Sequence, residues 1–162
     1  MIEFDDAALD EMIEDWKDSV LEEIIDQLDR IGLECVNEAR EKGDYTDRTG
    51  NLRNSIASAV VVDGKIAKTN LFIGEGKAQA HKFIEELASE YSEGIVLLLV
   101  AGMNYAVYVE FGHLYWRSLG EGFGYREEET RPYNVLSSAE DLADSLVEEL
   151  LNQIKNEGIT TD

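Results

Sequence analysis

Two pairs of residues in this sequence have the spacing of metal ligands. His81 and Glu85 are one helical turn apart, and Glu110 and His113 are three residues apart, so either pair can present two ligands on one helix face. A zinc site needs further protein ligands, and the chain has only two histidines and one cysteine. We therefore expect no functional metal site, and we expect both histidines on a solvated face or at an interface.

The other residue types used in catalysis are present without the arrangement that catalysis needs. Ser55 and Ser118 lack a sequence signature that would bring a histidine and an acid beside them. Paired acids such as those at 127–129 are common throughout this acidic chain, so they do not identify catalytic carboxylates. The alternating glycines at 120–124 have no strand-to-helix context and do not predict a phosphate-binding loop. We therefore expect neither an enzyme nor a bound cofactor.

The charge of the chain is strongly negative and unevenly distributed. There are 35 acidic and 14 basic residues among 162, for a formal net charge of -21. Residues 1–31 carry 12 acids and 2 bases, whereas residues 32–82 carry 7 acids and 8 bases. Binding to nucleic acid requires clustered Lys and Arg, so the composition argues against it. The charge favours solubility, a surface that DNA passes without adhering, or a surface that docks on a basic partner.

The remaining composition favours a single domain in a reducing compartment. One cysteine excludes an internal disulfide, and Cys35 falls on the apolar face of a predicted helix, where a buried structural thiol is expected. The acidic start at residues 1–6 lacks the basic and apolar regions of a signal peptide. The longest apolar run, at 95–101, is too short to span a bilayer and suits a buried strand. We therefore expect a cytoplasmic protein without membrane contact.

Apolar periodicity predicts an α+β fold with a long helix at each end. Residues 5–42 carry an apolar stripe at steps of three and four, and Gly32 interrupts it. A helix of this length is unusual in a small domain, so its first half is expected to pack on a neighbouring subunit, or the helix to bend near Gly32. The two terminal helices are expected to pack on a mainly antiparallel sheet of three to four strands.

Between the terminal helices, the corner at Asp47–Ile56 contains the densest cluster of structure-specifying polar residues. Thr49 and Asn51 can satisfy local backbone groups, Gly50 permits a turn, and Leu52 gives the next segment an apolar side. The segments expected after it are strands at 56–62 and 66–74 joined by Asp63-Gly64, a helix at 76–93 ending at Gly94, a strand at 95–101, a short helix at 104–112 capped by Asn104, a long loop at 113–131 and a helix at 136–156.

Eight aromatic residues crowd into about 29 positions near the end of the sheet region. Core packing accounts for some of them, but a short helix and a loop need fewer than this. Tyr and Trp together with Arg are typical of protein–protein hot spots, so an interface is favoured over a core alone. The aromatic residues are Tyr105, Tyr108, Phe111, Tyr115, Trp116, Phe123, Tyr125 and Tyr133.

Three stretches, in this order, resemble the motifs of one protein family. Tyr45–Ile56 (YTDRTGNLRNSI) is similar to its TGxLRxS signature, and Asn104–Gly112 (NYAVYVEFG) is similar to its YAxYVEFG segment. Arg131-Pro132-Tyr133, followed by Ser138-Ala139, resembles its closing RPF…PA element. The family is the head–tail joining and tail-completion proteins of the neck of long-tailed bacteriophages and prophages. His113 and Ser138 depart from its pattern, which usually has threonine and proline there.

This resemblance implies an α+β subunit that assembles into a ring, with a hexamer as the expected form. The ring would occupy the virion neck, contact neighbouring neck and tail proteins, and let DNA pass without specific binding. The chain would be assembled in the cytoplasm of the bacterial host. The structural and assembly residues of the motifs are Arg48, Thr49, Gly50, Leu52, Arg53, Ser55, Tyr105, Tyr108, Glu110, Phe111, Gly112, Arg131 and Pro132, with Tyr115, Trp116, Phe123 and Tyr125 as candidate interface residues.

Within the motifs, several contacts are expected. Arg48 and Arg53 are candidates for ion pairs with the acidic helix or with a neighbour, and Glu110 is expected to accept hydrogen bonds from the corner. The corner is expected to pack against the second motif, with Leu52 and Ile56 turned towards its aromatic residues. The alternative function is an acidic binding module, or DNA mimic, that inhibits a basic partner; the net charge alone supports it.

Overall fold

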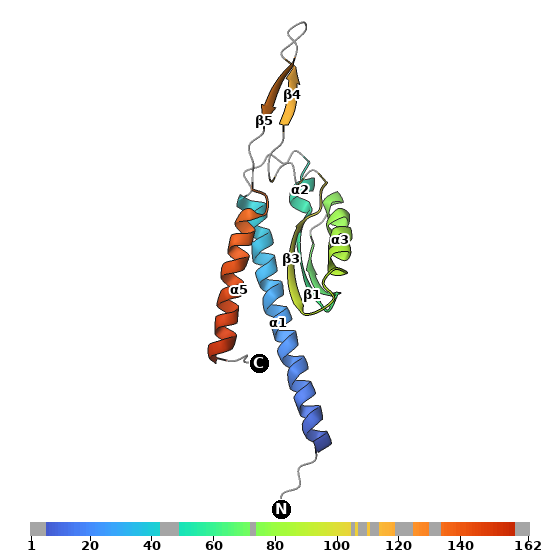
Figure 1. Ribbon diagram of the computed structural model, residues 1–162, viewed down its shortest axis with the longest axis vertical. Helices are drawn as coiled ribbons and strands as arrows, with labels where there is room; N and C mark the ends of the chain where they lie inside the picture. The colour runs from blue at the N-terminus through green and yellow to red at the C-terminus, as the bar shows by residue number, and fades with distance from the viewer. Residues whose placement is uncertain are drawn as a thin grey trace, which may run out of the picture.

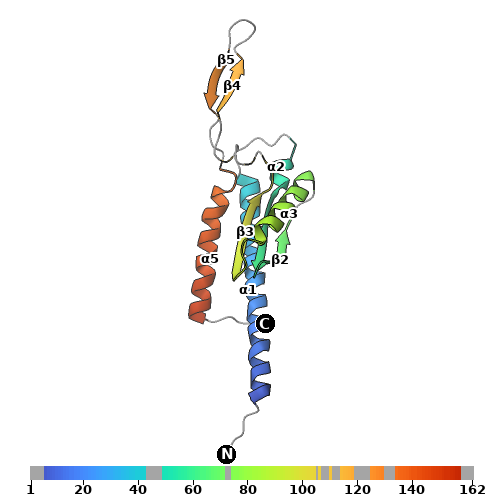
Figure 2. The same cartoon turned by 45° about the vertical axis from the view of Figure 1, so that its right-hand side comes forward.

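The protein is α+β, as predicted, with a long N-terminal helix, a C-terminal helix and a small antiparallel sheet (Figure 1). A computed structural model describes residues 6–42, 49–71, 74–104, 106, 110, 114–118, 125–129 and 134–157. The layers run from α5 (Ser137–Glu157) through α1 (Asp6–Lys42) and the sheet to α3 (Glu75–Ala88), as Figures 1 and 2 show from two directions.

Helix α1 has 37 residues, which corresponds to about 55 Å of helix, and it continues through Gly32 without interruption. A Cβ atom at Gly32 would lie 2.6 Å from Ser58 Oγ and 3.0 Å from Leu97 Cδ1. Gly32 therefore lets α1 approach the sheet closely, and this steric requirement explains the glycine better than a bend in the helix.

Polar contacts fix the position of α1 over the sheet beside this close approach. The Asn70 amide nitrogen donates to Asp29 Oδ1 at 2.9 Å and to the hydroxyl of buried Ser58 at 3.1 Å. Lys68 also donates to the Asp26 carboxylate, and this hydrogen bond lowers the pKa of Asp26. Because the Asp26–Lys68 pair is half-exposed, the buried hydroxyl and amide contribute more to the fixed crossing of helix and sheet.

The sheet has the order β2-β1-β3, with all pairs antiparallel. Its strands are β1 (Ile56–Val62), β2 (Lys65–Asn70) and β3 (Ile95–Ala101), so β3 matches its predicted bounds and β2 ends before the predicted Gly74. Asp63 and Gly64 have φ values of 48° and 76°, as the predicted Asp-Gly hairpin turn requires. Strand β1 is buried over six of its seven residues because α1 covers one face and α3 the other.

Helix α3 ends at Ala88, earlier than the predicted end at residue 93. The Ser89 hydroxyl donates to the Glu86 carbonyl at 2.7 Å and ends the helix. Ala80 and Ile84 form the buried face of α3, whereas Tyr91, which the helical spacing of the predicted segment 76–93 adds to the same face, lies beyond the end of the helix and is exposed. Helix α5 packs along α1, and its bounds differ from the predicted 136–156 by one residue at each end.

The predicted long loop at 113–131 was wrong because this segment forms a hairpin. Strands β4 (Leu114–Ser118) and β5 (Tyr125–Glu129) pair in antiparallel register from Leu114 opposite Glu129 to Ser118 opposite Tyr125. Aromatic residues favour strands, and cross-strand pairing satisfies backbone groups that a loop of this length would leave to water. The hairpin lies at one end of the molecule and the start of α1 at the other (Figures 1 and 2).

Ala106 and Glu110 have helical backbone, in agreement with the predicted short helix at 104–112. Residues 105, 107–109 and 111–112 of that segment lie outside the described residues. None of the helices within the described ranges is long and apolar enough to cross a membrane.

Candidate functional site

The corner that carries the first motif is built as its residue types predict. The Thr49 hydroxyl oxygen accepts the Asn51 backbone N–H at 3.3 Å, and Gly50 has φ 76°. A short helix, α2 (Asn51–Asn54), follows, and the Ser55 hydroxyl donates to the Leu52 carbonyl at 2.8 Å. Ser55 is fully buried, so its hydroxyl serves the backbone and is not available as a nucleophile.

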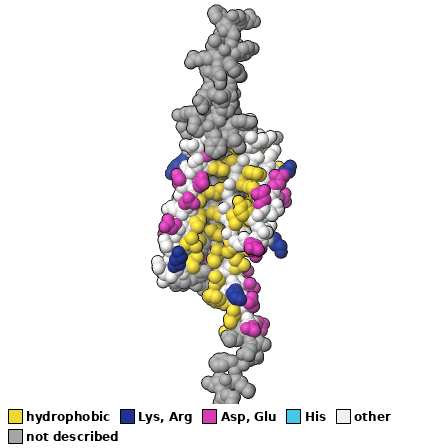
Figure 3. Space-filling view, in the orientation of Figure 1, with side chains coloured by type: hydrophobic (Ala, Val, Ile, Leu, Met, Phe, Trp, Pro, Cys, Tyr) yellow, Lys and Arg dark blue, Asp and Glu magenta, His cyan; other side chains and the backbone are white. Residues whose placement is uncertain are grey.

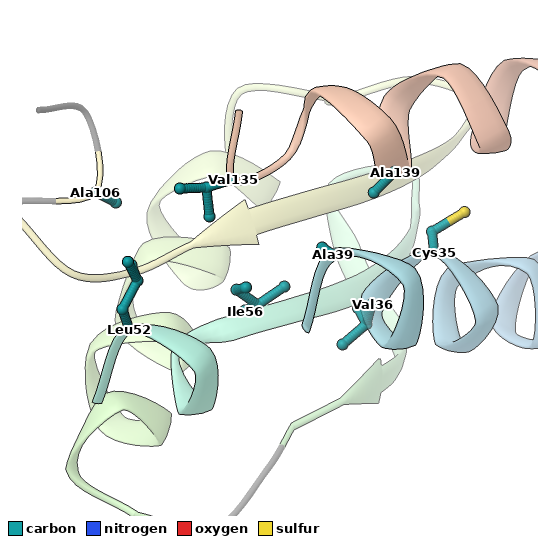
Figure 4. Close-up of a cluster of buried hydrophobic side chains, with 8 residues drawn as sticks. All are labelled: Cys35, Val36, Ala39, Leu52, Ile56, Ala106, Val135 and Ala139. Atoms are coloured by element: carbon teal, nitrogen blue, oxygen red, sulfur yellow. The ribbon is translucent and has the colours of Figure 1, made fainter. Parts of the chain in front are cut away.

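The motif segments converge on one buried cluster, which we call the motif corner (Figure 4). The first motif contributes Leu52 and Ile56, and the second contributes Ala106, each with no more than 6% of its surface exposed. Helix α1 and the start of α5 complete the cluster with Cys35, Val36, Ala39, Val135 and Ala139. Segments separated by more than 80 residues in sequence therefore share one core.

Glu110 joins the second motif to the start of α5. Its carboxylate oxygens accept the Leu136 backbone N–H at 2.9 Å and the Ser137 hydroxyl at 2.5 Å. The first N–H groups of a helix lack partners within the helix, and its N-terminus favours negative charge. Glu110 was expected to accept hydrogen bonds from the corner at Asp47–Ile56, and this stays a prediction because Asp47 and Arg48 lie outside the described residues. The bonds described for Glu110 come from the start of α5.

We expect Glu110→Ala to lower the free energy of unfolding by about 1–2 kcal/mol, because it leaves two donors at the start of α5 without their acceptor. Urea denaturation followed by circular dichroism would measure the loss. Glu148→Ala, on the exposed face of the same helix, is the matched control and should change stability by less than about 0.5 kcal/mol. Equal effects of the two substitutions would refute the capping role of Glu110.

Two arginines fasten the end of α1 to α2. Arg40 Nη1 donates to the Arg53 carbonyl at 2.7 Å, and Arg53 Nη1 donates to the Arg40 carbonyl in return. The structure joins the Arg53 guanidinium to the backbone of the acidic helix, and the expected ion pair of Arg53 with that helix or with a neighbour stays a prediction. Arg53 thus satisfies a carbonyl group near the C-terminal end of α1, and Arg40 satisfies one in α2.

Several residues singled out from the sequence cannot be placed. Tyr115, Trp116 and Tyr125 lie in β4 and β5, for which only the backbone is described. The others lie outside the described residues: Arg48, Tyr105, Tyr108, Phe111, Gly112, His113, Phe123, Arg131 and Pro132. The expected contact of Leu52 and Ile56 with aromatic residues of the second motif therefore stays a prediction, although Ala106 does bring the two motifs together.

The side chains considered for metal or thiol chemistry are in ordinary environments. His81 Nδ1 lies 3.4 Å from Glu85 Oε2, and both side chains are about half-exposed. Within the described part of the chain, no three His, Cys, Asp or Glu residues gather as a metal site would require. Burial raises the pKa of Cys35 to about 11, so its thiol is protonated and unreactive at neutral pH.

The first turns of α1 carry an apolar stripe that is exposed to solvent. Every residue from Asp10 to Ser19 is exposed, and we call this segment the projecting turns. Met12 and Trp16 have 68% and 64% of their surface exposed, and Ile13 has 40%. The same stripe continues into the buried face of α1 at Leu28 and Cys35, so the projecting turns have the pattern of a helix that packs.

A second apolar surface lies along the edge of the sheet between α3 and α5. It lines a groove with a volume of about 380 Å³, which we call the β3 groove. Hydrophobic side chains gather along this part of the face in Figure 3. The apolar side chains lining it include Phe83, Leu87, Leu99, Ala101, Val135 and Leu136. Nothing in the sequence pattern predicted the groove, because its walls come from three separate elements.

No protein-family model, curated protein or solved structure matches this chain. The resemblance to phage neck proteins consequently rests on the three sequence motifs alone.

Proposed function

We propose that this chain is a non-enzymatic structural protein of the head–tail junction of a phage or prophage, where it joins or completes head and tail. The observation that carries the proposal is that described residues from each of the three motifs lie in the motif corner. Leu52, Ala106 and Ala139 share one buried cluster, and Glu110 links the second motif to the third segment. A set of motifs that form one folded unit is expected of a family signature.

The projecting turns support assembly through contacts between subunits. A helical segment of about ten residues has little stability in water unless its apolar face is packed. Met12 and Trp16 are the most exposed large apolar residues of the described chain, and they lie on the same stripe. A neighbouring subunit that covers them would complete the helix, in agreement with the ring implied by the motifs, for which a hexamer is expected.

The charge of the subunit agrees with a ring around a DNA channel. Five acids in the projecting turns are exposed, at positions 10, 11, 14, 15 and 18, with Lys17 as their single base. Acidic surfaces repel phosphate and let DNA slide past without binding. The proposed partners are therefore copies of the same chain and adjacent neck and tail proteins.

The same exposed acids favour a second candidate function, an acidic module that binds a basic protein in place of DNA. Such binding is electrostatic and weakens steeply with added salt. A complex with a nuclease or repressor that forms at low ionic strength and dissociates at high ionic strength would favour this candidate.

Deleting the gene from the phage or prophage that carries it tests the proposal. Electron microscopy of the lysate should reveal DNA-filled heads and complete tails that are separate, and expression of the gene in trans should restore joined particles. Joined, infectious virions at the wild-type frequency after deletion would contradict the proposed function.

A further inference from the structure

The two edges of the three-stranded sheet differ in their protection against pairing with another strand. Edge strand β2 carries Lys65 and Lys68, and its pairing with β1 shifts register between Val60 and Val61. Lysines and bulges are the usual devices that keep an edge from accepting another strand. Edge strand β3 has the sequence IVLLLVA, with neither charge nor proline, and its pairing with β1 is regular. Among the described residues, no strand pairs with the outer edge of β3.

The β3 groove has the form of a binding site for an extended chain. Leu99 and Ala101 belong to the edge strand itself, and Phe83 and Leu87 come from the helix beside it. Extended peptides bind at such places by adding a strand to the sheet, with backbone hydrogen bonds along the edge and side chains in the groove. The occupant expected from this chemistry is a strand with apolar side chains.

The same chain contains a sheet that lacks a partner. Strands β4 and β5 form a two-stranded sheet that joins no other strand in the described residues. An isolated two-stranded hairpin is at best marginally stable in water, and a third strand or a packing surface is normally required. The edge of β3 could provide the additional strand that stabilises the hairpin, but the hairpin and β3 lie apart within one subunit (Figure 1).

Composition and charge select β4 as the strand that would meet β3. Strand β4 has the sequence LYWRS, with three apolar or aromatic residues and Arg117 as its single charge. Strand β5 has the sequence YREEE, with three acids and Arg126. Glu110 and Glu140 line the groove. Acidic groups at the groove attract the charge of β4 and repel that of β5.

We propose that strand β4 of one subunit adds to the outer edge of β3 in the next subunit, beside the β3 groove. This contact rests on the proposed ring assembly and identifies two of its surfaces. It is heterologous, because the hairpin of one copy meets a different surface of its neighbour, and heterologous contacts generate closed rings when the rotation between subunits permits.

Two variants, each blocking one side of the contact, test this arrangement. Phe83→Lys places a charge in the groove and keeps the hairpin, and Phe83 is exposed enough for the fold to tolerate the change. Trp116→Pro disrupts β4 and keeps the groove. Leu151→Lys, at an exposed apolar position on α5, is the matched control. Circular dichroism establishes that each variant is folded, and light scattering after gel filtration gives its mass.

The wild-type protein and Leu151→Lys should form the same closed oligomer, and each groove or hairpin variant alone should associate at least tenfold more weakly. Mixing Phe83→Lys with Trp116→Pro should yield dimers of twice the subunit mass that grow no further, because one contact is intact in each pair. Hydrogen exchange in the mixture should slow at residues 95–101 of the Trp116→Pro subunit.

Full-size oligomers of either variant alone, a mixture that stays monomeric, or unchanged exchange at residues 95–101 would overturn the proposed contact. A wild-type protein that remains monomeric at millimolar concentration would also overturn it. If deletion of the gene still leaves heads and tails unjoined, the proposed function stands even when the β4–β3 contact is overturned. Failure of the contact and failure of the function are therefore distinguishable.

Discussion

Gly102→Ala is expected to lower the free energy of unfolding by about 3 kcal/mol, because α3 occupies the space where a side chain would lie. A Cβ atom at Gly102 would be 2.4 Å from the backbone nitrogen of Ala80 and 2.5 Å from its Cα atom. These are backbone atoms in the middle of a packed helix, so no rotation of a side chain relieves the overlap. Gly102 also donates its N–H to the Ser55 carbonyl at 3.0 Å, so a displacement would reach the motif corner.

The effect should appear as a fall of roughly 6–12 °C in the midpoint of thermal unfolding, or as loss of soluble protein. Gly94→Ala is the informative control, because no atom lies within 4 Å of the Cβ position there and only the φ of 85° is unfavourable. That substitution should cost about 1 kcal/mol. If Gly102→Ala cost no more than Gly94→Ala, the close contact of α3 with the segment after β3 would be incorrect.

The elements with strong local signals could be predicted from the sequence. Strand β3 is an uninterrupted apolar run, and Asp63-Gly64 has the residue types that a tight hairpin turn requires, so both were placed correctly. The terminal helices differ from their predicted bounds by one residue at most ends, because their apolar stripes repeat over many turns. The fold class follows from these elements alone.

The end of one helix and the features that depend on tertiary contacts could not be predicted. The helical stripe at 76–93 includes Tyr91 by spacing, but α3 ends at Ala88, where Ser89 satisfies a carbonyl group. The acceptor role of Glu110 depends on the distant start of α5, to which no local pattern points. The hairpin at 114–129 was obscured because its residue types, aromatic and glycine-rich, suit a binding loop equally well.

In the candidate site, too, features with a local sequence signal could be predicted and features formed by distant segments could not. The corner residues Thr49, Gly50 and Ser55 form local bonds and turns, so their structural roles could be anticipated from residue type. The exposed stripe at Met12 and Trp16 was visible as periodicity, and the expectation that it meets a neighbouring subunit stays a prediction. The β3 groove could not be foreseen, because it exists only where α3, β3 and α5 come together.

The second large effect is expected when the protein is absent during assembly of the phage particle. A protein that joins finished heads to finished tails acts after both have been built, so both should accumulate in a lysate that lacks it. Adding the purified chain to that lysate should then restore joining without new protein synthesis. The extent of restoration should rise with the amount of protein added and should fall when Gly102→Ala replaces the wild-type chain, since the substitution removes folded protein.

The titre of infectious particles in a gene-deleted lysate, measured before and after addition of purified wild-type protein, tests the central claim most directly. We predict a low titre before addition and a rise of several orders of magnitude after it, with tails attached to heads in electron micrographs. A deleted lysate with a normal titre, or a low titre that the folded protein leaves unchanged although intact heads and tails are present, would contradict a role in head–tail joining.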